Sequence, residues 1–456
     1  MSPRALFVLM VAAFLFLWPT ITRAQASAGA SPDADPYTVT LYDPNPDHLW
    51  NRLYAAIFLR IDSSDGRKYG PDLLDILYWT ETTHLIVGPS HDRALKVLDE
   101  FIAGHGEALI SDPVKRAVMQ HDLWAVYDWT ERILNGTPGL GPALELRTRL
   151  AAVIKLIALS RQQIDALPDN YGEAIASGMF PAEPVPSDPA MPFLPPALFQ
   201  PDGPWTAIGS SPDYPLANQH MNGCYFRSTF TTFVRFPEGQ RSLKDYLDVV
   251  KNSKLVLPDF NRLKGRVLEE TPEKKNPEMP QIPVGTMVAL VRQMILIDNE
   301  GKFTQTHLTE SVQFRIYRRI ADEPPGPPSD NIEQHSQLFF AIRMNRKQLF
   351  AHRSGGLAAA GAHDTEFTFG PTVKLTGQDP FEAMDPRGIA FALIPTHVMQ
   401  SCVMCHHDAG IFSIKSVIDL FDLKNPKPLQ GLHVSTVRQE GEAAIDYSEK
   451  LEHSIK

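Results

Sequence analysis

The first third of the chain repeats apolar residues at helical spacing. From residue 47 to about 167, apolar positions recur three and four residues apart, which is typical of helices with one buried face. Ser90 marks one helix start, and Ser111 with Pro113 marks another whose helix runs to Gly136. We therefore expect a helical bundle in this region. Its clearest apolar stripes are Leu49, Leu53, Ala56 and Ile57, and Leu146, Leu150, Val153, Ile154 and Ile157.

After about residue 220 the period of the apolar residues changes from 3.6 to 2. Residues 287–297 are apolar and β-branched, residues 298–301 form a turn signal, and Val312, Phe314 and Ile316 then alternate with polar neighbours. This pattern predicts an antiparallel strand pair. The alternation returns at 338–344, and further strands are expected at 229–236 and 390–394. The fold class predicted is α+β, with a helical N-terminal domain followed by a β-rich, mainly antiparallel domain.

A proline-rich segment separates the two patterns. Eleven prolines lie between Phe180 and Leu216, too many for helix interiors or central strands. Phe193, Phe199 and Trp205 within it suggest an irregular linker that packs against the protein. The expected organisation is a signal peptide at 1–26, a helical domain at 36–178, a proline-rich linker at 179–220, a β-rich domain at 221–430 and a polar tail at 431–456.

One short motif near the C-terminal end carries a chemistry of its own. Cys402-Val403-Met404-Cys405-His406 has the C-x-x-C-H pattern that attaches c-type haem. The two thiols add across the two vinyl groups of haem, and the adjacent imidazole becomes the proximal iron ligand. With three cysteines among 456 residues, a chance match is rare. The motif therefore predicts one covalently bound haem c, anchored by Cys402 and Cys405 and ligated by His406.

Other uses of the same cysteines stay open. Thiolate and imidazole are preferred zinc ligands, so a zinc site with His407 as a further ligand is an alternative, although no second ligand pair has matching spacing. A redox dithiol is another, although the expected βαβ context is missing. Five arginines in or beside the predicted strands either line solvated strand faces or hold haem propionates. They are Arg315, Arg318, Arg319, Arg343 and Arg346.

The first residues have the features of a secretory signal. Arg4 precedes an apolar run from Ala5 to Trp18, and Ala24-Gln25-Ala26 offers a cleavage site between small residues. The run is shorter than the ~20 residues of a membrane span, and no later stretch reaches that length. We expect an exported bacterial protein in the periplasm, without a transmembrane anchor. Bacterial c-type haem is attached after export, so the two features agree.

The charge balance narrows the class of partners. The net charge is −10, and removing 1–26 takes away Arg4 and Arg23 and no acidic residue, so the protein becomes still more acidic. This argues against binding to nucleic acid or to anionic lipid. An acidic surface suits a basic redox partner, so a periplasmic redox partner protein is the expected partner.

The motif and the export signal together resemble exported bacterial c-type cytochromes. The resemblance covers these two features alone, and it implies haem binding and electron transfer. No methionine follows Met404, so the sixth iron ligand is not the downstream methionine of the small cytochromes. Candidates for a distal ligand are His352, His363 and His433, because each lies near glycine or polar residues where a loop could close over a haem.

Three function classes follow from the sequence. The first is a monohaem electron carrier whose remaining residues recognise a partner. The second is a haem enzyme with an open iron that acts on peroxide or on a small nitrogen or oxygen species, although no catalytic residue is identified. The third is a zinc-binding protein without redox activity. Whether the protein is an enzyme stays open.

Overall fold

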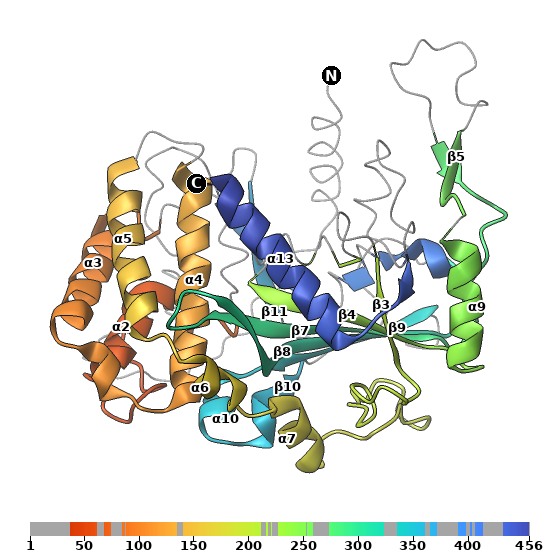
Figure 1. Ribbon diagram of the computed structural model, residues 1–456, viewed down its shortest axis with the longest axis horizontal. Coiled ribbons are helices and arrows are strands. Elements are labelled where there is room, and N and C mark those ends of the chain that lie inside the picture. The colour runs from red at the N-terminus through yellow and green to blue at the C-terminus, as the bar shows by residue number, and fades with distance from the viewer. Residues whose placement is uncertain are drawn as a thin grey trace, which may run out of the picture.

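The computed structural model has an α+β fold in which helices pack against one large antiparallel sheet (Figure 1). This confirms the predicted fold class. The N-terminal helices stand at one end of the sheet, and the C-x-x-C-H motif comes after the last long strands in the chain. The structure describes residues 37–61, 68–73, 84–86, 88–134, 140–210, 216–217, 220, 227–251, 253–258, 273–322, 335–360, 365–371, 391–397, 402–403, 406–413 and 432–455.

The helical part is built from four main helices, followed by two short ones. They surround a core in which Trp50, Leu53, Leu98, Phe101 and Leu150 are fully buried. Asp112 caps the third of the main helices by accepting a hydrogen bond from the Val114 N–H (2.9 Å), so the cap is one residue after the predicted Ser111. The helices are α2 (Leu49–Phe58), α3 (Gly88–Ala103), α4 (Pro113–Leu134), α5 (Leu140–Leu156), α6 (Arg161–Asp165) and α7 (Asn170–Ala176), with a 3₁₀ turn η3 (Gly106–Leu109) and a small strand pair β1 (Arg60–Ile61) and β2 (Lys68–Tyr69).

Seven antiparallel strands form the main sheet in the order β10-β9-β8-β7-β4-β3-β13. The turn predicted at 298–301 joins β7 to β8, and Asp298 there accepts hydrogen bonds from the Glu300 and Lys302 N–H groups. The strands are β3 (Thr206–Gly209), β4 (Ser228–Arg235), β7 (Met287–Ile297), β8 (Phe303–Tyr317), β9 (Gln337–Met344), β10 (Leu357–Ala359) and β13 (His433–Val434).

Smaller elements complete the described chain. Two strand pairs lie outside the main sheet: β5 (Val256–Pro258) with β6 (Glu273–Lys275), and β11 (Thr365–Pro371) with β12 (Phe391–His397). The remaining helices are α9 (Gln240–Val250), α10 (Arg346–Phe350) and α13 (Val437–Ile455), with 3₁₀ turns η5 (Ser354–Gly356) and η6 (Gly410–Ser413).

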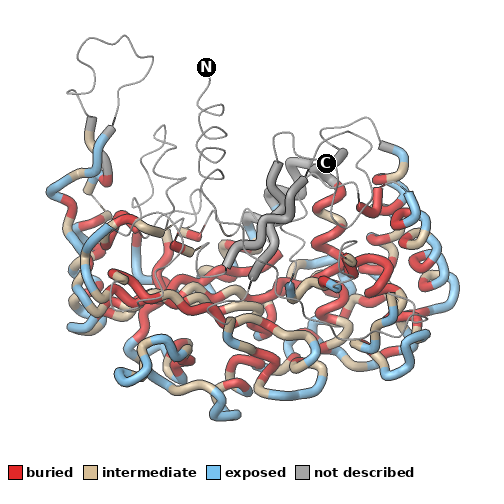
Figure 2. Tube along the Cα trace, turned by 180° about the vertical axis from the view of Figure 1, so that it is seen from behind, coloured by how far each residue is buried: buried red, intermediate tan, exposed pale blue. Residues whose placement is uncertain are grey.

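One face of the sheet is covered by the proline-rich segment. Phe233, Phe314 and Phe340 alternate out of β4, β8 and β9 onto this face, and Phe193 packs directly on Phe314 with 4.7 Å between ring centroids. Trp205 packs there as well. The proline-rich segment thus forms one wall of a core beside the sheet, whose strands are largely buried (Figure 2). Aromatic side chains at the required positions explain why a segment without regular structure is ordered.

The opposite face of the sheet carries α9 and the turn η6. Val234, Val288 and Tyr317 point to this face and share a core with Leu247 of α9 and Phe412 of η6. Because side chains alternate along each strand, Arg315, two residues before Tyr317, points to the same face. The turn η6, which follows the C-x-x-C-H motif, is therefore packed on the side of the sheet away from the proline-rich segment.

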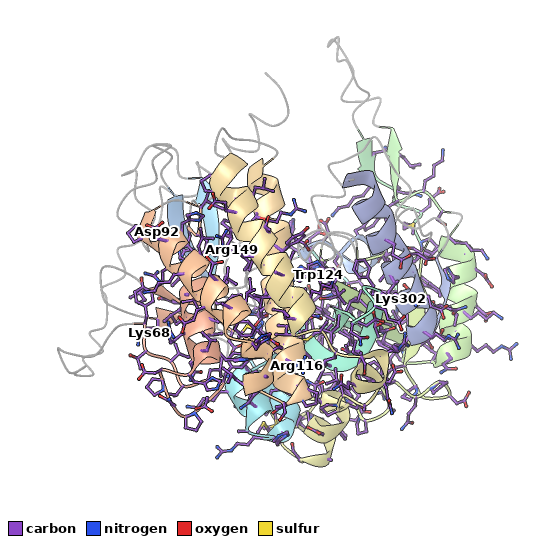
Figure 3. All side chains as sticks on the ribbon, turned by 60° about the vertical axis from the view of Figure 1, so that its left-hand side comes forward. Lys68, Asp92, Arg116, Trp124, Arg149 and Lys302 are labelled. Carbon is purple, nitrogen blue, oxygen red and sulfur yellow. The ribbon has the colours of Figure 1, made fainter. Side chains whose placement is uncertain are left out.

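The helices and the sheet pack against each other and share buried clusters. Trp124 of α4 stacks on Phe303 of β8 with 5.1 Å between ring centroids (Figure 3). Gln120 of α4 also exchanges two hydrogen bonds with the backbone of Ile297, of 2.8 and 3.1 Å. These contacts cross the expected boundary between the helical and β-rich parts.

Residues 431–456, the expected polar tail, contain a strand and a helix. Within this segment β13 pairs with β3, and α13 packs across β4 and β8 (Figure 1). The residues of α13 buried against the protein include Gly441 and Ala444, which are small and give little hydrophobic signal. The segment 179–220 likewise contains β3, so the sheet begins before the expected start of the β-rich domain at 221.

None of the helices in the described part of the chain is long and apolar enough to span a membrane. The expected signal peptide at 1–26 lies outside the described residues.

Candidate functional site

The C-x-x-C-H motif follows β12 in the chain. Its described residues, Cys402, Val403 and His406, have helical backbone conformation. Val403 is buried, whereas Cys402 and His406 are partly exposed. Met404 and Cys405 lie outside the described residues.

The imidazole of His406 is held by the backbone that follows the motif. Its Nδ1 lies 2.7 Å from the carbonyl oxygen of Ser413. A carbonyl only accepts hydrogen bonds, so Nδ1 carries the proton and donates it, which leaves the lone pair on Nε2. This is the tautomer of a metal-ligating histidine whose other ring nitrogen is fixed by a backbone carbonyl. The amide nitrogen of Gln337 also donates to the His406 carbonyl at 2.9 Å.

The Ser413 carbonyl is itself positioned by β8. Arg315 Nη1 donates to the same oxygen at 2.7 Å, and the Tyr317 and Ser413 hydroxyls are 2.8 Å apart. Gly410 begins the turn η6 with φ 52°, a left-handed conformation that glycine adopts without strain. The Ile411 N–H donates to the Gln281 side chain at 3.1 Å. The loop after His406 is therefore fixed to the sheet at several points.

An ion pair fixes the same loop from its outer side. Asp408 lies 2.6 Å from Lys275 Nζ, and the Ala409 N–H donates to Asp322 at 2.9 Å. The Asp322 side chain also lies 3.2 Å from Lys275. The residues between the haem motif and Ser413 thus have a defined position, which is what a ligating histidine requires.

A second imidazole lies beside His406. The rings of His220 and His406 are nearly parallel, with 10° between their planes and 6.2 Å between their centroids. His220 also faces Phe230 of β4, with 6.3 Å between ring centroids. The sequence interpretation did not single out His220, because the segment around it has no periodicity and no spacing relation to the motif. The fold alone brings these two histidines together.

Both imidazoles are kept neutral at physiological pH. Burial, together with the positive charges of Arg315 and Arg292, lowers the pKa of His220 to about 4. Burial also lowers the pKa of His406 well below its ordinary value, assisted by the charge of Arg315, although the hydrogen bond to Ser413 opposes this. A neutral imidazole is the form that binds a metal ion. Both rings are therefore in the protonation state that metal ligation requires.

Arg292 and Arg315 differ in how their charges are balanced. Arg292 of β7 lies 3.0 Å from Glu310, and its Nε donates to the Ser228 hydroxyl at 3.1 Å. Ser228 in turn donates to Glu310 at 2.6 Å. Arg315 donates to the Ser413 carbonyl, which is neutral. Of the five arginines considered from the sequence, Arg315 contacts the site through the Ser413 carbonyl. Arg346 forms a buried ion pair with Asp122 at 2.6 Å.

The candidate distal ligands from the sequence have other surroundings. His352 is exposed in the turn after α10, where its φ is 51°. Gln337, which contacts His406, begins β9, and the turn that carries His352 follows the other end of this strand. The length of the strand therefore separates Gln337 from that turn by roughly 20 Å. His433 is exposed in the edge strand β13 opposite Gly209. His363 lies outside the described residues. His220, rather than His352 or His433, is the described histidine whose ring the structure places parallel to that of His406.

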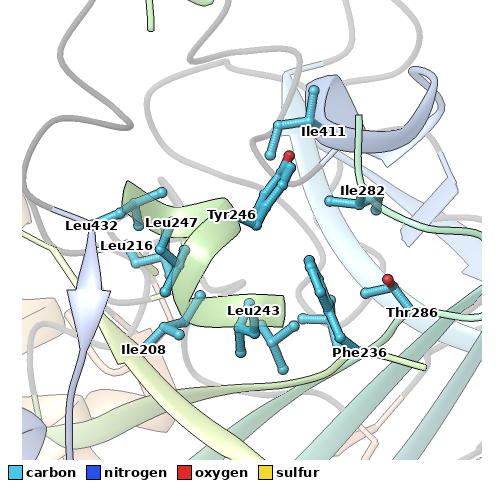
Figure 4. Close-up of a pocket in the computed structure, with 12 residues that line it drawn as sticks. Ile208, Leu216, Phe236, Leu243, Tyr246, Leu247, Ile282, Thr286, Ile411 and Leu432 are labelled. Atoms are coloured by element: carbon cyan, nitrogen blue, oxygen red, sulfur yellow. The ribbon is translucent and has the colours of Figure 1, made fainter. Parts of the chain in front are cut away.

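A small apolar pocket is built partly from the two segments that carry the histidines. Leu216 precedes His220 by one helical turn of sequence, Ile411 follows His406, and both line the pocket together with α9 and the sheet (Figure 4). Tyr246 and Thr286 supply the polar atoms of the lining, and the Tyr246 hydroxyl donates to the Pro280 carbonyl at 2.8 Å.

Among the residues that the structure describes, no group of three or more histidine, cysteine, aspartate or glutamate side chains gathers as a metal site. Comparison of the chain with models of protein families, with curated proteins and with solved structures gave no match.

Proposed function

We propose that this protein carries one covalently attached haem c and transfers electrons. Cys402 and Cys405 would anchor the haem through thioether bonds, and His406 would be the proximal ligand of the iron. The observation that carries the proposal is the hydrogen bond of 2.7 Å from His406 Nδ1 to the Ser413 carbonyl, directly after a C-x-x-C-H motif. It leaves Nε2 of this histidine available for the iron.

The haem would supply a reversible one-electron centre, and the protein would set its orientation and potential. Ser413 fixes the ring plane of His406 through its carbonyl. Arg315 places a positive charge beside that carbonyl, which favours the reduced state of a nearby iron centre. Packing of Val403 and Phe412 in the protein interior limits access of water to the motif. Each of these residues acts on the position or the energy of the bound group.

The expected compartment and partner belong to the same proposal. Arg4, the apolar run after it and Ala24-Gln25-Ala26 support export to the bacterial periplasm, where c-type haem is attached. The net charge of −10 supports a redox partner with a basic docking face. Association should then weaken as salt is added, because exposed charges are screened over about 10 Å at 0.1 M salt.

The test is haem attachment in the full-length protein, produced in a bacterium that matures c-type haem. We expect a mass increase of one haem that survives denaturation, and a haem band that is reduced and reoxidised reversibly. Cys402→Ala and Cys405→Ala should weaken or abolish covalent attachment, and His406→Ala should change the spectrum. His352→Ala is the matched control, because this exposed histidine lies away from the motif.

Two results would overturn the proposal. The first is a parent protein that takes up no covalent haem under these conditions while zinc is bound instead. The second is unchanged haem content and spectra in the Cys402, Cys405 and His406 variants. Either result would indicate that the motif binds zinc or acts as a plain dithiol.

A further inference from the structure

The parallel pair of His220 and His406 has the spacing of two ligands of one metal ion. Two imidazoles that bind a metal from opposite sides have their centroids roughly 6 Å apart, because two metal–nitrogen bonds of about 2 Å add to the nitrogen-to-centroid distance of each ring. The observed separation is 6.2 Å with planes 10° apart. The observed centroid separation therefore matches the one expected for two imidazoles that bind one iron.

We propose that His220 is the sixth ligand of the haem iron, opposite His406. This inference rests on the proposed function, since it concerns the same haem. It makes the iron six-coordinate, with two imidazole ligands, and so describes the site as an electron-transfer centre rather than an open binding site.

The surroundings of His220 support this role. The ring lies against Phe230, with 6.3 Å between centroids, and faces Arg315 and Arg292 on the sheet. The nearly parallel planes of the two imidazoles are consistent with ligation of one metal ion.

The chain positions of the two ligands also support the inference. His406 is fixed to β8 through Ser413 and Arg315, whereas His220 lies between the proline-rich segment and β4. The sheet therefore presents the two imidazoles from separate segments. The haem would be bound between two segments that are far apart in the sequence. This fixes its orientation more firmly than a single loop would.

The experiment uses the full-length, haem-loaded protein and four variants. The parent should show a low-spin iron in both oxidation states and should not bind carbon monoxide. His220→Ala should keep the covalent haem but lose the low-spin signal and bind carbon monoxide in a 1:1 ratio. Added imidazole should restore the low-spin spectrum. His220→Met should exchange one nitrogen ligand for sulfur and raise the reduction potential.

His352→Ala and His433→Ala are the matched controls, because both are exposed histidines considered from the sequence as distal ligands. Each should leave the low-spin spectrum unchanged. The inference is overturned if the parent protein is high-spin and binds carbon monoxide, or if His220→Ala retains the parent's spectrum. It is also overturned if either control, rather than His220→Ala, loses the low-spin signal.

The outcomes separate this inference from the proposed function. Covalent haem in the parent, together with an unaltered spectrum in His220→Ala, removes His220 as a ligand and leaves the haem protein intact. Absence of covalent haem from the parent refutes the proposed function itself. If His220→Ala does not fold, His220→Met decides the question, because an unaltered potential and spectrum there exclude ligation by this residue.

Discussion

Replacing Arg315 by glutamine in the haem-loaded protein should lower its reduction potential. Arg315 Nη1 and His406 Nδ1 both bind the Ser413 carbonyl oxygen, each at 2.7 Å. A positive charge near an iron centre stabilises the reduced state, which carries one positive charge fewer. Removal of the arginine also leaves this carbonyl to accept from His406 alone. A stronger bond from His406 favours the oxidised state, so both effects have the same sign.

The size of the shift follows from the geometry. With both nitrogens 2.7 Å from one oxygen, they are at most about 5.4 Å apart, and the ligated iron lies about 4 Å beyond Nδ1. At roughly 9 Å the Coulomb energy is about 1.8 kcal/mol for an effective dielectric constant of about 20, and about 0.5 kcal/mol for that of water. For one electron these energies correspond to about 80 and 20 mV.

The assay is a spectroscopic redox titration of the parent and of Arg315→Gln at the same ionic strength. Arg149→Gln is the matched control, because Arg149 lies on the helical part (Figure 3), where it pairs with Asp99. The control should shift the potential by less than about 10 mV, since a partly exposed and paired charge on the helical part is screened. A potential that stays constant or rises in Arg315→Gln would refute the reasoning.

Two further predictions concern stability. Arg346→Met removes the partner of Asp122, whose side chain is 4 % exposed. It should lower the free energy of unfolding, measured by urea denaturation, by about 3–5 kcal/mol. The control is Arg52→Met, which breaks the exposed pair of Arg52 with Glu100 and should lower this free energy by less than about 1 kcal/mol. The haem-free protein should lose up to about 3 kcal/mol of stability as the pH falls from about 6.5 to about 4, because the pKa of His220 is lowered to about 4 by folding and the unfolded chain takes up the proton first. Thermal unfolding against pH checks this, and a haem-free protein equally stable at both pH values would contradict it.

Much of the sheet could be predicted from local pattern. The apolar run at 287–297 has the bounds of β7, and the predicted turn and alternation match the β7–β8 hairpin. Period-2 alternation is informative there because one hairpin fixes its own register. The short strands β3 and β13 were missed because they pair over a long distance in the chain. With four and two residues, they are also too short to show a period of apolar residues.

The helix α13 was missed for a related reason. Its sequence is mostly polar, and the residues it buries against the protein include Gly441 and Ala444. Close packing through small residues leaves little hydrophobic signal, although it places a helix firmly. The proline-rich segment was expected to pack against the protein, but its role as one wall of the core depends on aromatic residues of three strands, which meet only in the folded chain.

The motif residues of the site were found from sequence, whereas their surroundings were not. Cys402, Cys405 and His406 stand at a fixed spacing, which is a chemical signature by itself. His220 and Ser413 have no such spacing relation to the motif that could be recognised beforehand. Arg315 was one of five similar arginines, and its contact with Ser413 distinguishes it from the others. Second ligands and their support are properties of the tertiary structure.

The late position of β13 and α13 in the chain affects the order of assembly. Both elements follow the motif by about 25 to 50 residues, and β13 covers the edge of β3. Pairing of β13 with β3 therefore has to wait until this last part of the chain is present. Until then β3 is an open edge that other chains can pair with. In the proposed haem protein, the segment that carries the attachment motif thus enters the periplasm before the segment that closes this edge of the sheet.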